Sequence, residues 1–457
     1  MFVGRERELS KLQSAYQKDK FEMAVMYGRR RVGKTRLITE FTADKDTIYF
    51  SALEVSEKMN LSNLSRAIMA YETGRNIGDF SYGSFEACFE TLYHLSKEKR
   101  LVFVIDEYPY LAGSFKGISS LLQQYIDLKF KETKLFIILC GSSMSFMEHQ
   151  VLGYESPLYG RRTMQLKINP LNFWECRQFH QHFTTEESAV IYGITGGIPQ
   201  YLEYIDDSKS LADNIIDNFF DNTAYLYDEP GNLLKQELRE PALYNSIITA
   251  IANGASRINE ISTKTGIDNP VCSKYINSLI ELGIVRKEKP ATEQDAKRSI
   301  YRLDDGMFRF WYRFVAPSVD RICQNQGAVA YRNMESHIPD FMGQVFEEIC
   351  KQFLWKMNLA GTIDFAKAER WWGTNPQLRR QEEIDIIAYD ESKMIFCECK
   401  WRNEKVSRRI AEDLIAKSEM FCGKEKSFIL FSKSGFTEDC LALQKEKKIK
   451  MFSLSEF

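Results

Sequence analysis

The segment from Gly28 to Thr35 constrains the fold of this chain more than any other feature. Its sequence, GRRRVGKT, matches the phosphate-binding loop pattern GxxxxGK[ST] at every fixed position. An apolar run of strand length (residues 23–27) precedes it, and a run typical of a helix start (residues 36–41) follows it. A chance match in a glycine-rich surface loop would lack this context. Strand, loop and helix in this order predict an α/β P-loop NTPase with a parallel sheet, because the helix N-terminus adds its positive end to the anion site.

Each fixed position of the loop has a chemical role. The glycines let several backbone N–H groups point at one polyphosphate. Lys34 reaches the β- and γ-phosphates, and the hydroxyl of Thr35 ligates Mg²⁺. We therefore expect ATP or ADP as the ligand and assign the whole loop to nucleotide binding: Gly28, Arg29, Arg30, Arg31, Val32, Gly33, Lys34 and Thr35.

Two further apolar runs lead to candidate catalytic residues. Residues 101–105 form a continuous hydrophobic run, typical of a strand buried on both faces, which ends in Asp106 and Glu107. Ligands bind at the carboxyl ends of the strands in open α/β sheets. We therefore expect Asp106 to hold Mg²⁺ and Glu107 to polarise the attacking water. Residues 135–140 form another such run, and Ser142 after it is a candidate sensor of the γ-phosphate.

Arg161 and Arg162 follow this strand, where a charge-neutralising arginine finger could act on the phosphates. The sequence does not choose between the two residues. It also does not choose between action within the chain and action on a neighbouring subunit. The alternative is a basic pair on the surface.

Several motifs in a fixed order resemble those of a known family. The opening FVGRERE, the GRRRVGKT loop, the VIDE strand end, the PLYGRR segment and the GGIPQYL segment follow one another along the chain. In this order they resemble the archaeal-type ATPases of the AAA-related STAND group. The resemblance implies that Gly4, Arg5 and Glu6 lie near the adenine base. It also implies that Gly197 and Pro199 belong to a helical lid that closes over the nucleotide.

Composition narrows the class of protein. A chain of 457 residues predicts several domains, and no apolar stretch approaches the roughly 18–20 residues of a membrane-spanning helix. Charges begin at Arg5, where a signal peptide would need its apolar region. The ten cysteines follow no disulfide or zinc spacing. We therefore expect a cytoplasmic protein without a membrane partner, and leave a homo-oligomer or dimer open. The net charge of −2 means that affinity for nucleic acid must come from local patches.

A helical segment and a break signal suggest the domain limits. Residues 172–233 are expected to be helical and to form the lid, with these core residues: Phe173, Trp174, Phe179, Ile191, Tyr192, Leu202, Ile215, Ile216, Phe219 and Phe220. Pro230-Gly231 is the strongest boundary signal, because this pair breaks regular structure. We therefore predict an ATPase core at 1–170, the lid at 171–232, a third domain at 233–315 and a fourth at 316–457.

The third domain has the pattern of a winged helix-turn-helix. Helices are expected at 241–252, 257–265 and 271–282, and wing strands at 284–288 and 299–303. Acidic residues nearly balance the basic ones, so the domain is either a DNA-binding module or an internal packing module. The side chains expected to face DNA are Ser273, Lys274, Asn277, Lys287, Lys297 and Arg298.

The fourth domain carries a second candidate site. Residues 383–388 and 394–401 predict a hairpin, in which the two-residue period places Glu398 and Lys400 on one face. Asp385 on the adjacent strand can converge on them, and a helix at 343–350 can add Glu347. This pattern resembles the core of the restriction-endonuclease-like PD-(D/E)XK nucleases, which have an α/β fold.

That resemblance implies a metal-dependent site. Asp385 and Glu398 would bind Mg²⁺ or Mn²⁺, with Glu347 as a further ligand, and Lys400 would orient or activate the water. Ile384 stands where many members have proline. The alternative is a hairpin with a surface salt bridge, worth under about 1 kcal/mol. Basic residues that suit either a phosphate backbone or the solvated face of a helix follow: Arg402, Lys405, Arg408, Arg409 and Lys417.

Three functions remain open from the sequence. The first is an ATPase that acts on DNA and carries a nuclease-like domain. The second is a nucleotide switch of the STAND type, whose C-terminal domain is a non-cutting interaction module. The third is a DNA-binding regulator that uses nucleotide to set its oligomeric state.

Overall fold

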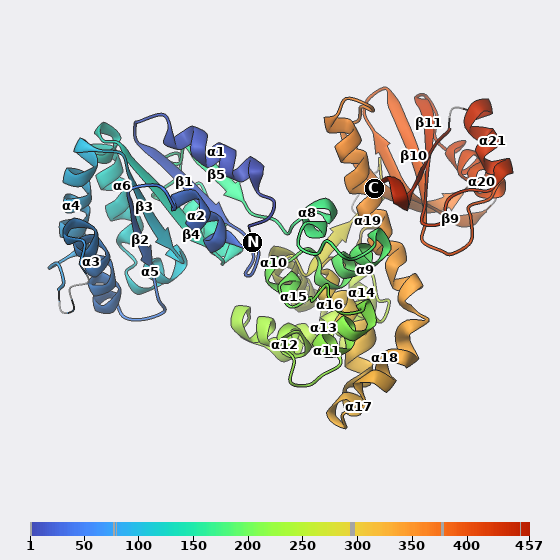
Figure 1. Cartoon of the computed structure of the whole chain (residues 1–457), viewed down its shortest axis with the longest axis horizontal. Helices are drawn as coiled ribbons and strands as arrows, with labels where there is room; N and C mark the ends of the chain where they lie inside the picture. Colours follow the sequence, from blue (N-terminus) through green and yellow to red (C-terminus); the bar gives the residue numbers. More distant parts are fainter. Residues whose placement is uncertain (1, 76–77, 79, 293–297, 376–378, 448) are drawn as a thin grey trace. The chain divides into compact units, whose positions relative to one another are not determined.

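The chain forms two compact units in the computed structural model (Figure 1). The N-terminal unit comprises residues 1–171 and 198–200, and the C-terminal unit comprises residues 172–197 and 201–457. The residues that the structure describes are 2–75, 78, 80–292, 298–375, 379–447 and 449–457. Among them, no helix combines the length and the apolar character that a membrane crossing requires.

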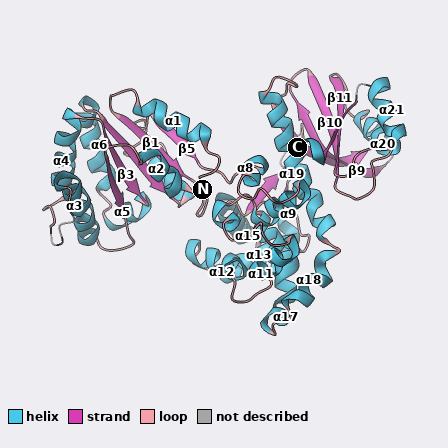
Figure 2. Cartoon of the chain, in the orientation of Figure 1, coloured by secondary structure: helices cyan, strands magenta, loops and turns pink. Residues whose placement is uncertain are grey.

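A five-stranded parallel sheet forms the centre of the N-terminal unit (Figure 2). Its strand order, β2-β3-β4-β1-β5, places β4 between the strand before the phosphate-binding loop and the strand that ends in Asp106. The strands are β1 (Glu22–Tyr27), β2 (Thr47–Ser51), β3 (Leu101–Asp106), β4 (Leu135–Gly141) and β5 (Met164–Lys167). Every residue of β1, β3 and β4 is buried, as continuous apolar runs predict. The predicted parallel sheet is therefore confirmed.

Helices cover both faces of this sheet. On one face, buried side chains of α3 to α6 form a single core with alternate residues of the strands. On the other face, Phe41 of α2 packs edge-to-face on Phe136 of β4, with ring centroids 5.9 Å apart. The helices are α1 (Glu6–Tyr16), α2 (Lys34–Thr42), α3 (Glu57–Thr73), α4 (Phe85–Glu98), α5 (Tyr108–Ser114), α6 (Ile118–Leu128) and α7 (Met144–Phe146).

The segment predicted as a lid is helical, and most of it belongs to the C-terminal unit. Its helices are α8 (Phe173–Arg177), α9 (Thr185–Thr195), α10 (Pro199–Leu202), α11 (Leu211–Phe219) and α12 (Tyr225–Glu237). Helix α12 corrects the predicted break, because it runs through Pro230 and Gly231. A proline inside a helix costs about 3 kcal/mol. Burial of neighbouring side chains, Leu226, Leu233 and Leu234 among them, offsets that cost.

Three helices and a two-stranded antiparallel sheet follow. They are α13 (Pro241–Ala252), α14 (Ile258–Thr265), α15 (Asn269–Glu281), β6 (Val285–Glu288) and β7 (Ile300–Leu303). Ile276 and Leu279 of α15 are fully buried, so this helix packs inward as its apolar pattern predicts. Four more helices lead to the last domain: α16 (Gly306–Phe310), α17 (Val319–Cys323), α18 (Gly327–Glu335) and α19 (Ile338–Leu359).

The end of the chain forms a mixed five-stranded sheet in the order β12-β11-β10-β9-β8. The β9–β10 pair is the predicted hairpin, and β10, β11 and β12 run parallel. One face packs on α20 and α21, and Phe353 of α19 contacts Phe431 and Phe452 on the sheet. The elements are β8 (Lys367–Asn375), β9 (Arg380–Tyr389), β10 (Lys393–Lys400), α20 (Arg408–Ser418), β11 (Glu425–Ser432), α21 (Glu438–Lys447) and β12 (Ile449–Ser453).

Candidate functional site

The phosphate-binding loop connects the end of β1 to the start of α2. Gly28 lies so close to the backbone of Ile168 that an added Cβ would collide with its carbonyl oxygen. Gly33 adopts a φ of 87°, which L side chains rarely reach. Gly28 is therefore required because the backbone of Ile168 comes so close, and Gly33 is required because its backbone is left-handed.

Lys34 is the buried cation of this loop. Its side chain is only 6% exposed, and its Nζ donates hydrogen bonds to the carbonyl oxygens of Gly28 and Arg29, both at 2.9 Å. Burial lowers the pKa of Lys34, because desolvation disfavours the charged form. A polyphosphate would favour the charged form again, so the electrostatics of the loop suit an anion.

Asp106 lies beside the loop and gathers three donors. The hydroxyls of Thr35 and Tyr49 donate to its Oδ2 at 3.1 Å and 2.6 Å, and the N–H of Glu107 donates to its Oδ1 at 3.0 Å. Thr35 and Asp106 thus bring a hydroxyl and a carboxylate together, the hard oxygen ligands that Mg²⁺ prefers. Sequence reasoning missed Tyr49, which no motif identified.

Glu107 and Ser142 meet at the carboxyl ends of β3 and β4. Glu107 has a φ of 53°, in the left-handed region. The backbone N–H and the hydroxyl of Ser142 donate to its Oε2 at 3.2 Å and 3.0 Å. Ser142 therefore holds the predicted catalytic carboxylate, and its role as a phosphate sensor stays a prediction.

The opening motif and Pro199 lie at the sides of the loop. The buried Arg5 guanidinium donates to the carbonyl oxygens of Val32 at 3.0 Å and Asn169 at 2.6 Å. Gly4 has a φ of 66°, and Glu6 is exposed at the start of α1. A Cβ on Gly33 would lie 3.7 Å from Cγ of Pro199. The structure thus brings Arg5 and Pro199 to the loop.

Arg161 and Arg162 lie at the opposite edge of the sheet. The N–H of Thr163 donates to the carbonyl oxygen of Met23 at 2.9 Å, near the start of β1, whereas the loop follows the end of that strand. Nε and Nη2 of Arg161 donate to Asp127 at 3.0 Å and 2.6 Å. The structure does not bring these arginines to the loop of the same chain.

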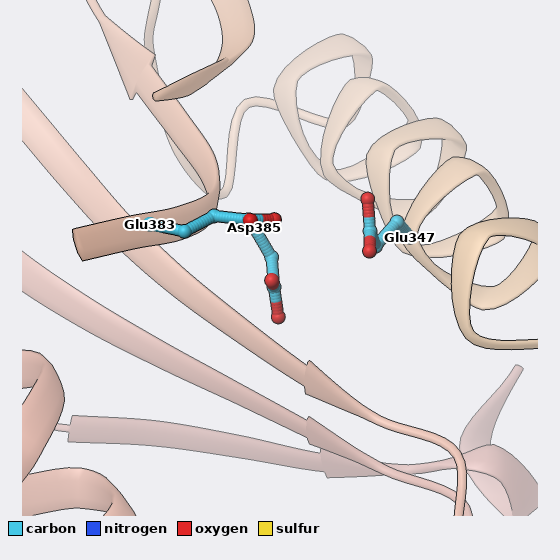
Figure 3. Close-up of side chains that lie close together, drawn as sticks. All are labelled: Glu347, Glu383 and Asp385. Atoms are coloured by element: carbon cyan, nitrogen blue, oxygen red, sulfur yellow. The ribbon is translucent and has the colours of Figure 1, made fainter. Parts of the chain in front are cut away.

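Three carboxylates converge in the C-terminal unit and form what we call the carboxylate centre. Glu347 projects from α19 toward Glu383 and Asp385 on β9 (Figure 3). One carboxylate oxygen from each lies within 4.8 Å of the others, and all three side chains are half-buried. The sequence predicted Glu347 and Asp385. It did not predict Glu383, although the two-residue period places Glu383 on the same face as Asp385.

Glu398 and Lys400 complete this centre. Nζ of Lys400 lies 2.5 Å from Oε1 of Glu398 and 3.7 Å from Oδ2 of Asp385. Burial and the Asp385 charge raise the pKa of Glu398. Burial alone would lower the pKa of Lys400, but Asp385 and Glu398 outweigh it and raise that pKa. Burial and Asp385 also raise the pKa of Glu347 to about 7. The Asp385 charge thus disfavours ionisation of Glu347 and Glu398, and a divalent cation would relieve this repulsion.

Lys417 belongs to the same centre. Its Nζ donates to the backbone oxygen of Glu383 at 3.0 Å and lies 3.9 Å from Oε2 of Glu398. It therefore points inward, which corrects its assignment to a phosphate-binding or solvated helix face. Arg408 and Arg409 pair with acids four residues ahead on α20, at 2.8 Å and 3.9 Å. Arg402 is half-buried and Lys405 is exposed.

The predicted DNA-facing side chains differ in exposure. Lys274, Asn277, Lys287 and Arg298 are exposed, and Ser273 is half-buried. Lys297 lies outside the described residues. These positions are compatible with contact to a large ligand, and they do not by themselves identify one.

Comparison with known proteins identifies an ATPase domain in the first part of the chain and a domain of unknown function in the last part. The model of an ATPase domain predominantly from Archaea matches residues 2–205, and a domain of archaeal and bacterial proteins of unknown function matches residues 311–412. An uncharacterized protein of Methanocaldococcus jannaschii is 33% identical over 435 residues, which cover 92% of each chain. An uncharacterized ATP-binding protein of that organism is 47% identical over 45 residues, 10% of this chain and 76% of its own.

Among solved structures, the Walker-type ATPase of Pyrococcus abyssi has a similar fold. The match has a TM-score of 0.51 and 19% sequence identity, and it covers 68% of this chain and 96% of that one. At this identity the likeness concerns the fold alone. It agrees with the parallel sheet and the loop described above.

Proposed function

This chain belongs to the archaeal-type ATPase family and is an ATPase, and we propose that it acts on DNA, which its carboxylate centre cleaves with the help of a divalent metal ion. The observation that carries the second part is the convergence of Glu347, Glu383 and Asp385 within 4.8 Å, beside Lys400. Such a group of hard oxygen ligands suits Mg²⁺ or Mn²⁺. We further propose that residues 241–303 form a winged helix that engages the DNA.

In the ATPase site, the residues of the chain have separate tasks. The loop backbone and Lys34 bind the phosphates. Thr35 and Asp106 are the residues that would hold Mg²⁺, which would neutralise phosphate charge. Glu107 orients the attacking water and accepts its proton. Arg161 or Arg162 serves the loop of a neighbouring subunit, since both lie far from the loop of their own chain.

In the carboxylate centre, Glu347, Glu383, Asp385 and Glu398 are the residues that would hold the metal ion. A bound metal ion stabilises the charge that develops on the phosphate. Lys400 orients the attacking water through the ammonium group that Glu398 and Asp385 keep charged. Lys417 fixes the backbone of β9 at Glu383 and so keeps two ligands in place.

The experiment is a cleavage assay. Purified protein is incubated with linear and supercoiled DNA, with Mg²⁺ or Mn²⁺, and with or without ATP. Cleavage is expected for the unmodified protein and for Lys393→Ala, an exposed control at the other end of β10. It is expected to be lost in Lys400→Ala. No cleavage by the unmodified protein under any of these conditions would contradict a nuclease.

A second candidate function is a nucleotide switch of the STAND type. The observation that favours it is the pair of hydrogen bonds from Ser142 to Glu107, which engage Oε2 of the carboxylate and leave only Oε1 unengaged by Ser142 for a water. A switch predicts tight ADP binding, slow turnover and no DNA cleavage. The assay above and a measurement of ATP turnover separate the two functions.

A further inference from the structure

A basic pocket lies between β6, α19 and β8, all in the C-terminal unit. Its volume is about 450 Å³, and its cationic lining residues are Arg286, Lys287, Lys289, Lys351 and Arg370. Glu288 and Glu369 are the acidic residues of the lining. The described lining thus carries five positive and two negative charges, in a chain whose net charge is −2.

The acidic residues of this pocket already have partners. Glu288 lies 2.6 Å from Nε of Arg286, and Glu369 accepts a hydrogen bond from the hydroxyl of Tyr389 at 2.6 Å. Within the described part of the chain, Lys287, Lys289 and Lys351 form no ion pair. Lys287 lies over the Tyr301 ring, with its Nζ 5.8 Å from the ring centroid. Lys289 and Lys351 therefore remain as the lysine charges of the described lining without an ion pair or a ring contact.

Arg370 connects the pocket to the carboxylate centre. It lies at an irregularity of the β8–β9 ladder between Glu369 and Trp371, and such bulges re-aim side chains next to active sites. Its carbonyl oxygen accepts from the N–H of Ala291 at 2.8 Å. Its guanidinium forms an ion pair with Glu383, while its Nε is buried without a hydrogen-bond partner.

Lys351 makes the same connection along α19. It follows Glu347 by four residues, about one helical turn, so both side chains project from the same face of the helix. The helix α19 therefore carries Lys351 of the pocket and Glu347 of the carboxylate centre, and the irregularity of β8 carries Arg370, which pairs with Glu383 of that centre. A bound anion in this pocket would lie next to the carboxylate centre.

We propose that this pocket binds a phosphate group of a DNA strand and so guides the strand to the carboxylate centre. The proposal rests on the proposed function and adds the site that holds the substrate. The cations supply the charge that a phosphodiester needs, and the carboxylates alone would repel it. Lys289 and Lys351 are the residues that the proposal assigns to this contact.

The test measures DNA binding without cleavage. Labelled single-stranded and double-stranded DNA is titrated with the full chain in EDTA, from about 50 to 300 mM salt, so that binding does not depend on nuclease activity. The variant is Lys289→Gln/Lys351→Gln. The charge-matched control is Lys58→Gln/Lys235→Gln, which changes exposed lysines on α3 and α12. Circular dichroism and thermal unfolding report that each protein is folded, and ATP turnover in the N-terminal unit is expected to be unchanged.

The expected result follows from counterion release. Each lost phosphate contact reduces the steepness of log affinity against log salt concentration by about 0.9 for duplex DNA. At 0.1 M salt this corresponds to an association constant about eightfold lower. We expect the pocket variant to bind more weakly by this factor or more, and the control to bind like the unmodified protein.

Three outcomes would overturn the proposal. The first is equal DNA affinity of the pocket variant and the control, and the second is no DNA binding by the unmodified protein. The third is that inorganic phosphate at millimolar concentration displaces the DNA and binds with an affinity equal to that of the DNA. The last would assign the pocket to a small phosphate ligand. A loss of binding in the variant, combined with no cleavage by the unmodified protein, would retain the pocket and refute the nuclease.

Discussion

The nucleotide site and the carboxylate centre differ in where their charged residues come from in the sequence. In the nucleotide site, one loop supplies the glycines, Lys34 and Thr35, and the lysine contacts the carbonyl oxygens of its own loop. In the carboxylate centre, acids from α19, β9 and β10 meet lysines from β10 and α20. The phosphate-binding loop of the first site is local in the sequence, although tertiary packing adds Tyr49 and Asp106 to it, and the second site is assembled by tertiary packing throughout.

This difference explains why the two sites differ in how readily a sequence identifies them. A loop that wraps a phosphate needs fixed residues at fixed spacing, so its pattern is specific. A group of converging acids needs only carboxylates on facing surfaces, which many spacings can supply. The predictions below test whether the two sites also differ in their dependence on single side chains.

The largest effect is expected for Glu107→Gln. General acid–base catalysis contributes about 10²- to 10⁴-fold, so kcat for ATP should fall within this range while ATP binding is retained. Steady-state ATP hydrolysis and a nucleotide titration measure the two quantities. Glu98→Gln on α4 is the exposed control, and an unchanged kcat in Glu107→Gln would remove Glu107 from catalysis.

The next effect is the loss of nucleotide binding in Lys34→Ala. Removing one partner of a buried charge pair costs about 2–5 kcal/mol, so the Kd for ATP should rise about 30-fold or more. Titration with a fluorescent ATP analogue measures it, with Lys58→Ala as the control. Wild-type affinity in Lys34→Ala would contradict the assignment of the loop.

Glu383→Gln tests the carboxylate centre at the residue that the sequence did not single out. Loss of one carboxylate should weaken Mn²⁺ binding about 10-fold or more, since even outer groups of metal sites contribute 10- to 100-fold. Calorimetric titration of the nucleotide-free protein measures it. Glu391→Gln, in the exposed turn between β9 and β10, should bind Mn²⁺ normally. Equal Mn²⁺ affinities of Glu383→Gln and Glu391→Gln would show that Glu383 is not a metal ligand and leave the other acids of the carboxylate centre as the candidates.

Much of the fold and part of each site could be predicted from the sequence. Buried apolar strands such as 101–105 and the loop glycines leave local patterns, so β3 and the phosphate-binding loop were found. Pro230 was misinterpreted because local propensity predicts a break, whereas burial of α12 against its neighbours decides the structure. Tyr49, Lys417 and Arg370 were missed because only tertiary packing brings them to their sites.

Tyr49→Phe tests such a missed residue. The variant removes the 2.6 Å hydrogen bond to Asp106 and keeps the ring. A hydrogen bond to a charged group contributes about 1.5–3 kcal/mol when buried and less when solvated. We expect the Kd for ATP with Mg²⁺ to rise a few-fold, with little change when Mg²⁺ is omitted. Equal changes in both conditions would show that Tyr49 does not act through Asp106.

The smallest expected effect is on the free energy of unfolding of the C-terminal unit at acidic pH. Burial lowers the pKa of His180, whose Nε2 lies 2.9 Å from the carbonyl oxygen of Ile205. Below the unfolded pKa of about 6.5, the unfolded chain binds a proton that the folded chain does not. Stability should therefore fall as the pH drops from there through the lowered pKa of the folded state.

Denaturant unfolding at several pH values measures this loss, and His180→Asn should flatten the profile in that range. A variant of lower stability but unchanged pH dependence would contradict the role of His180. The N-terminal unit should show no corresponding change in His180→Asn, because the side chain belongs to the other unit.

The brief return of residues 198–200 to the N-terminal unit has a consequence for how the nucleotide site is built into the chain. The chain leaves the N-terminal unit after residue 171, returns for these three residues, with Pro199 beside Gly33, and leaves again. The peptide that borders the phosphate-binding loop is therefore continuous at both of its ends with residues of the C-terminal unit. A substitution at Pro199 would change the surroundings of Gly33 through a segment that is adjacent in the sequence to no other part of the N-terminal unit.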